Sequence, residues 1–117
     1  MRRGALYRAD GALIVPRAWK ASNAWDRMRG LLGRPPLARD EALLIERCAS
    51  VHTLGMRYAL DVAFLDAEGR VVKLSRGLKP LRFAAAAGAR DALELAAGAA
   101  ETLGIVRGAA LRWREQA

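Results

Sequence analysis

The strongest structural signal in the chain is a pair of apolar runs joined by a four-residue turn. Ala59 to Leu65 and Arg70 to Leu74 are rich in strand-forming residues, and Asp66-Ala67-Glu68-Gly69 lies between them. A short loop with glycine between two such runs is typical of a β-hairpin. The pair therefore predicts two antiparallel strands near the middle of the chain.

The other apolar runs are also short. Pro16 is expected to end the first of them, residues 12–15, or to place this strand at a sheet edge. Ser22 is the expected N-cap of a helix in which Trp25, Met28 and Leu32 recur at helical spacing and are interpreted as core residues. The predicted strands span residues 12–15, 42–45 and 91–96 and the region around 111–113, and the predicted helices span 23–32 and 98–103.

These strands are not each followed by a helix, so they do not form alternating βαβ units. We therefore expect an α+β fold with a mainly antiparallel, strongly curved, barrel-like sheet and one or two short helices. No linker, internal repeat or low-complexity segment divides the 117 residues. A single domain over residues 1–117 is predicted.

The composition of the chain indicates its cellular location. No apolar run approaches the roughly 18 residues of a membrane-spanning helix, and no apolar segment of a secretory signal follows the first basic residues. Cys48 is the only cysteine, which excludes an intrachain disulfide. We expect a soluble cytoplasmic protein that is a monomer or a weak dimer, with Trp19 and Trp113 as candidate dimer contacts.

The formal net charge of +8 is unevenly distributed. Residues 1–39 carry nine basic and two acidic residues, whereas residues 40–117 carry eleven basic and ten acidic residues. A local basic excess can attract nucleic acid or anionic lipid. The chain has no dense basic block and no nucleic-acid-binding motif, so specific nucleic-acid binding is not expected. A basic interaction protein that docks through residues 1–39 stays open as an alternative function.

A catalytic site is a further alternative. His52 is the only histidine, Cys48 precedes it by four residues and Asp61 follows it by nine. A hydrolase or transferase could use His52 as a general base, with Asp61 or Cys48 as its helper. However, no nucleophile signature surrounds Cys48, and a lone cysteine is more often a small buried apolar residue. No catalytic residue is assigned, and the prediction leans away from an enzyme.

Metal and cofactor sites are not predicted. A structural zinc site needs four cysteine or histidine ligands, and the chain has one residue of each type. No glycine-rich phosphate loop stands between a strand and a helix.

The segment from His52 to Asp61 is the candidate ligand site, because polar residues on a loop held by rigid strands often bind ligands. In the leading hypothesis, the chain is a non-catalytic binding module for a small anionic or polar ligand or a partner. Arg57 would pair with an anion, and the competing interpretation makes Asp61 part of a scaffold network. The candidate residues are His52, Thr53, Met56, Arg57, Tyr58 and Asp61.

Four motifs of the sequence resemble motifs that occur in the same order in a known family. They are residues 25–34, residues 50–57, the pair 60–66 and 69–72, and residues 93–98. Over about residues 12–113 the chain resembles the uncharacterised prokaryotic family DUF192, domain of unknown function 192. The resemblance implies a compact α+β fold with a curved, barrel-like sheet, and it brings no established activity, substrate or cofactor. The family's later Gly-Asp pair is Gly108-Ala109 here, so that aspartate has no counterpart.

Overall fold

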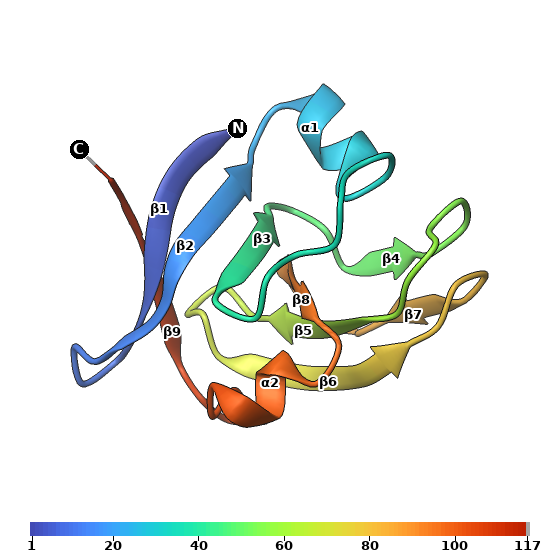
Figure 1. Ribbon diagram of the computed structural model, residues 1–117. Coiled ribbons are helices and arrows are strands. Elements are labelled where there is room, and N and C mark those ends of the chain that lie inside the picture. The colour runs from blue at the N-terminus through green and yellow to red at the C-terminus, as the bar shows by residue number, and fades with distance from the viewer. Residues whose placement is uncertain (117) are drawn as a thin grey trace.

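The computed structural model describes residues 1–116, which form a seven-stranded sheet, a two-stranded sheet and two short helices (Figure 1). None of the helices in these residues is long and apolar enough to cross a membrane. The strands are β1 (Arg2–Arg8), β2 (Leu13–Ala21), β3 (Glu41–Ile45), β4 (Ser50–His52), β5 (Leu60–Leu65), β6 (Val71–Leu78), β7 (Phe83–Ala85), β8 (Asp91–Ala96) and β9 (Leu111–Glu115), and the helices are α1 (Ala24–Arg29) and α2 (Ala99–Thr102).

The large sheet has the strand order β6-β5-β8-β3-β2-β1-β9. Every pair in it is antiparallel except β2 with β3. The predicted hairpin is present as β5 and β6, and the predicted strand 91–96 is β8. The prediction of a single compact α+β domain with a mainly antiparallel sheet is therefore confirmed.

The barrel-like curvature is not confirmed, because the sheet is not closed along its edges. Its strand order ends at β6 on one side and at β9 on the other. An isolated bridge between Arg70 and Ala110 connects the two ends of this order. The amide of Val71 also donates a 2.8 Å hydrogen bond to the carbonyl of Ala109. These contacts join the edges at one place only.

Both faces of the central strands are buried. Along β3, Ala42 and Leu44 belong to one core cluster, while Leu43 and Ile45 belong to the other. Such alternation follows from the two-residue period of a strand. The first cluster includes Ala99 of α2, and the second includes residues of the loop after α1 and of β4. A polar side chain on a central strand is therefore buried whichever face it occupies.

The N-terminal part differs from the prediction. Strand β1 was not expected, and β2 continues beyond Pro16 to Ala21. The pairing of β1 with β2 shifts between Gly4 opposite Ala18 and Leu6 opposite Val15, so two residues of β2 lie against one of β1. Proline is tolerated at such a bulge, since its missing N–H interrupts no regular ladder bond.

Helix α1 is shorter than predicted, and its apolar stripe points outward. Asn23, not Ser22, is the N-cap and accepts a 2.8 Å hydrogen bond from the amide of Asp26. Gly30 ends the helix with a φ of 52°. Trp25 is 65% exposed and Met28 is 73% exposed. The interpretation of this stripe as core was wrong, because the turn at Gly30 separates the helix from the buried residue Leu31 that follows it.

The predicted loop at residues 48–58 contains strand β4, which pairs antiparallel with β7. Val51 and Ala84 face the core, whereas His52 lies opposite Phe83 on the outer side. A three-residue strand whose partner residues lie 31 to 35 positions away leaves no periodic signal, so the sequence pattern could not reveal it.

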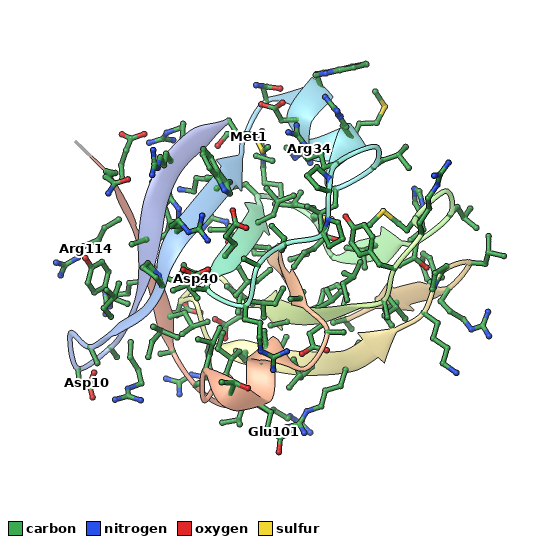
Figure 2. All side chains as sticks on the ribbon, in the orientation of Figure 1. Met1, Asp10, Arg34, Asp40, Glu101 and Arg114 are labelled. Carbon is green, nitrogen blue, oxygen red and sulfur yellow. The ribbon has the colours of Figure 1, made fainter. Side chains whose placement is uncertain are left out.

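The basic residues of the first third do not form one free patch. Arg2 pairs with Glu115, Arg8 with Asp10 and Arg17 with Asp40, at N–O distances of 2.6, 3.2 and 2.7 Å. Figure 2 shows Asp10, Asp40 and Arg34 well separated along the molecule. The positive charge of residues 1–39 is thus spread over several elements and partly neutralised.

Candidate functional site

Glu94 is a buried acidic residue on an interior strand. In β8 it lies between Leu43 of β3 and Val62 of β5. Its side chain is 5% exposed, and its neighbours Leu93 and Leu95 are buried on the opposite face. Glutamate is rarely buried without a partner. Its position in the middle of a sheet therefore requires an explanation.

The carboxyl group of Glu94 has no partner in the fold. Its Oε1 atom is buried and makes no hydrogen bond to any residue between 1 and 116. Burial raises the pKa of this carboxyl from 4.5 to about 7, because desolvation disfavours the charged form. Near neutral pH, both the acid and the carboxylate are populated. An unpartnered buried polar group of this kind is uncommon in proteins.

Glu94 lines a small cleft of about 90 Å³, which we call the Glu94 cleft. One wall is formed by residues 27–32, from the end of α1 and the loop after it. The other wall is formed by Cys48 and by residues of β4 and the loop that follows. A Cβ atom at Gly30 would lie 3.5 Å from Oε1 of Glu94. Glycine at this position therefore keeps the space beside the carboxyl open.

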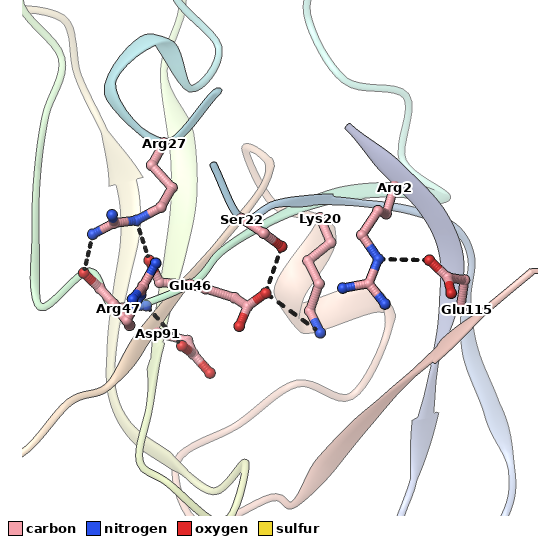
Figure 3. A network of polar contacts seen from close by, with 8 residues as sticks. All are labelled: Arg2, Lys20, Ser22, Arg27, Glu46, Arg47, Asp91 and Glu115. Carbon is pink, nitrogen blue, oxygen red and sulfur yellow. Dashed lines mark hydrogen bonds and ion pairs between the residues drawn. The ribbon is translucent and has the colours of Figure 1, made fainter. Parts of the chain in front are cut away.

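The α1 wall is anchored by a polar network (Figure 3). The guanidinium of Arg27 donates hydrogen bonds of 2.7 and 2.8 Å to the carbonyls of Glu46 and Arg47. The amide of Arg47 in turn donates to the carboxylate of Asp91, which begins β8. The hydrogen bond that the Ser22 hydroxyl donates to the Glu46 carboxylate holds the pKa of this carboxyl below its usual range. These contacts fix α1 against the end of β3.

The predicted site residues fall into two groups. His52 and Met56 line the Glu94 cleft. Met56, Arg57 and Tyr58 line a neighbouring groove of about 680 Å³, whose other side is residues 31–36. The Tyr58 hydroxyl donates a 3.2 Å hydrogen bond to the carbonyl of Arg34 across this groove. Burial, followed by the charge of Glu94, raises the pKa of Tyr58. Four of the six predicted residues therefore line these two adjoining hollows.

Thr53 and Asp61 belong to the scaffold. The Thr53 hydroxyl donates to the carbonyl of Lys79 at 2.7 Å and accepts from the amide of Arg82 at 2.8 Å. Asp61 is 1% exposed, and both of its carboxylate oxygens accept backbone N–H groups. These bonds give the side chains of both residues partners within the fold.

Cys48 is not an activated nucleophile in this arrangement. Burial raises the pKa of its thiol, and the Sγ atom donates a hydrogen bond to the carbonyl of Ser50 at 2.9 Å. A nucleophilic cysteine needs the opposite shift, toward the thiolate. In residues 1–116, no group of three or more histidine, cysteine, aspartate and glutamate side chains could hold a metal ion.

Substitution of His52 or Arg57 by alanine is expected to change the free energy of unfolding by less than about 0.5 kcal/mol, because both side chains are exposed. Urea unfolding of the two variants beside the parent protein measures this. Thr53→Ala is the matched comparison from the same loop, and it should be clearly destabilising. Equal losses in all three variants would place His52 and Arg57 in the scaffold as well.

Sequence reasoning missed Glu94. A glutamate between two leucines in a strand normally indicates a solvent-facing position, because the faces alternate. The other residues of 92–96 are apolar, as in a strand buried on both faces, but only the pairing of β8 with β3 and β5 shows that burial.

Comparison with known proteins gives the family and the fold. Residues 6–113 match the model of the DUF192 family, described as uncharacterized ACR. No curated protein matches. A protein of unknown function from Novosphingobium aromaticivorans is 24% identical, with a TM-score of 0.79 over 95% of this chain and 84% of its own. A provisionally assigned transcription regulator from Sinorhizobium meliloti is 22% identical, with a TM-score of 0.80 over 96% of this chain and 92% of its own. At these identities the likeness concerns the fold alone.

Proposed function

Since the chain belongs to the DUF192 family, whose members are described only as uncharacterised, we propose a function from its own geometry: a non-catalytic binding protein whose ligand enters the Glu94 cleft. One observation carries the proposal. The buried Oε1 atom of Glu94 has no hydrogen-bond partner in residues 1–116, and it lies on a cleft that reaches the surface. A ligand group that donates a hydrogen bond would complete this site.

The chemistry of the cleft indicates which hydrogen-bond donor a ligand would carry. A carboxyl group with a pKa of about 7 accepts hydrogen bonds from hydroxyl, amide or ammonium groups. An ammonium gains the additional attraction of the carboxylate. Apolar side chains form much of the surrounding wall, among them Leu31, Ile45 and Val51. Arg27 and Arg29 also line the cleft, but the guanidinium of Arg27 is bonded to backbone carbonyls and Arg29 is exposed. The group preferred beside Glu94 itself is therefore an ammonium carried on a short aliphatic chain.

The size of the cleft limits what enters it. A volume of about 90 Å³ is far below the 300 Å³ or more of a pocket for a drug-sized molecule. Only the end of a ligand fits beside Glu94, and the remainder would lie in the adjoining groove with Arg57 and Tyr58. An acidic group there would pair with Arg57. This placement of the ligand retains the predicted role of Arg57 and assigns His52 and Met56 to the cleft.

An NMR titration tests the proposal, with butylammonium as the probe and butanol as its uncharged counterpart. Butylammonium is expected to shift the amide signals of residues 27–32 and 50–56, and butanol should shift them less. Glu94→Gln should weaken butylammonium binding about tenfold, since the charge-assisted bond is lost. The matched control is Glu101→Gln, an exposed glutamate on α2. Shifts that map elsewhere, or that persist in Glu94→Gln, would contradict the assignment.

A further inference from the structure

The surface around α1 and two adjacent loops is unusually apolar. Six of the nine large apolar side chains exposed within residues 1–116 lie on α1, on the loop after it, on the loop after β4 or on residues 81–83 at the start of β7. Leu54 is 56% exposed, and Leu81 and Phe83 are each 68% exposed. Exposed apolar groups that gather in one region mark an interaction surface, whereas scattered ones do not. The apolar face consists of Trp25, Met28, Leu32, Leu54, Leu81 and Phe83.

Several of these side chains lie close to one another or on segments that are joined. Met28, Leu32 and Leu54 line the rim of the same cleft. The second loop is joined to the first, since the amide of Leu81 donates a 3.2 Å hydrogen bond to the carbonyl of Thr53. Phe83 lies opposite His52 in the β4–β7 pair. Figure 1 shows both loops projecting from the end of the small sheet, with α1 above it.

The loop of Leu81 is hydrogen-bonded to Thr53 and contains an unfavourable backbone conformation. Leu81 has a φ of 63°, in the left-handed region that leucine rarely adopts. The buried Thr53 hydroxyl fixes the residues on either side through the carbonyl of Lys79 and the amide of Arg82. The result of this strain is that a leucine side chain is presented to solvent at the tip of the loop. Strained residues of this kind gather at functional sites.

The charges beside the apolar face are almost all positive. Residues 24–34, 53–58 and 79–83 contain six basic side chains and one acidic side chain. The acidic residue, Asp26, is paired with the N-terminal amine at 3.3 Å. Arg29, Arg57, Lys79 and Arg82 belong to the same segments as the exposed apolar residues and are themselves exposed. The face is complementary to a surface that is both anionic and apolar.

We propose that this face docks the protein on the surface of an anionic lipid bilayer. Leu54, Leu81 and Phe83 would enter the headgroup region, and the interleaved basic residues would contact lipid phosphates. Trp25 belongs to the residue type that concentrates at membrane interfaces. This inference does not use Glu94, but the apolar face shares Arg57 and the rim of the Glu94 cleft with the proposed function.

Flotation with phosphatidylglycerol vesicles tests the docking. The parent protein should float with these vesicles and not with pure phosphatidylcholine vesicles. The triple variant Leu54→Ser, Leu81→Asn, Phe83→Ser keeps every charge and is expected to bind about tenfold more weakly, since apolar insertion is lost. Asparagine suits the left-handed position, so this change should not harm folding. Leu13→Ser with Val106→Ser is the matched control, since both residues are exposed outside the apolar face.

Tryptophan fluorescence gives a second readout. Trp25 is the exposed one of the three tryptophans, so insertion should move the protein's emission to shorter wavelength, and Trp25→Phe should abolish that shift. Equal flotation of parent and triple variant would identify simple electrostatic adsorption and overturn the proposal. Failure of the parent to float with phosphatidylglycerol vesicles would also overturn it, and would leave the apolar face to a protein partner.

Discussion

Replacing Asp61 by alanine should lower the free energy of unfolding by about 3 kcal/mol. The Asp61 carboxylate accepts hydrogen bonds from the amides of Gly77 at 2.8 Å, Gly98 at 3.0 Å and Ala100 at 3.1 Å. Gly77 and Gly98 are exposed, so water can partly replace their lost bonds. Ala100 is buried, and its amide would be left without an acceptor. Urea unfolding of Asp61→Ala measures the loss.

The Asp61 prediction has a matched control in the same hairpin. Asp66 also accepts two backbone amides, from Glu68 and Arg70, but in an exposed turn. Asp66→Ala should therefore cost only about 1 kcal/mol. A loss for Asp61→Ala no greater than that for Asp66→Ala would show that Asp61 is not a structural residue. It would then return to the candidate ligand site.

The role of Asp61 also explains how α2 begins. This helix of four residues has Gly98 as its N-cap and no side-chain cap of its own. Asp61 on β5 supplies the missing acceptor from 37 residues away. Caps are normally predicted from the residue before the helix. An acceptor from another strand can be identified only after the sheet has brought β5 beside β8.

Local signals in the sequence were sufficient for half of the fold. The hairpin of β5 and β6, strand β8 and helix α2 were predicted within a few residues, because a turn or a glycine marks their ends. Strands β4 and β7 were not, since each depends on a distant partner. Strand β1 was also missed, although it pairs with its neighbour β2 across a short turn. The outward stripe of α1 was misread as core. Periodicity shows that a helix has an apolar face but does not show whether that face meets the core.

The candidate site shows the same division. The segment from His52 to Asp61 was predicted as the candidate site from its concentration of polar residues on a loop. The buried group beside it was not, because Glu94 becomes unusual only when β3 and β5 are placed on either side of β8. Glu94 could therefore not be identified before the pairing of these strands was known.

The buried carboxyl of Glu94 should give the protein an unusual dependence of stability on pH. Its pKa is about 7 in the folded protein and 4.5 in the unfolded chain. The folded state therefore binds more protons between these values, and stability falls as pH rises. The stabilising contribution is fully present below about pH 4.5 and is lost as pH rises through about 7. The shift corresponds to about 3 kcal/mol.

Glu94→Gln isolates this contribution from the rest of the protein. Several exposed carboxyl groups, such as those of Asp40 and Glu115, have pKa values lowered by arginine partners and act in the opposite direction. Arg27, Arg29, Cys48 and His52 also line the cleft. All of these groups are present in both proteins, so the difference between variant and parent removes their direct contributions.

The two proteins should have similar stability near pH 4.5, where Glu94 is protonated in the folded protein and about half protonated in the unfolded chain. At pH 8 the glutamine variant should be more stable by about 3 kcal/mol, because it carries no buried charge. Urea unfolding at both pH values measures the difference, with Glu101→Gln as the exposed control. A difference that is the same at both pH values would mean that Glu94 ionises as readily in the folded protein as in the unfolded chain. An unfolding curve that favours the parent at pH 8 would mean that the carboxylate has a cationic partner in the fold. In that case Glu94 would not be free to receive a ligand.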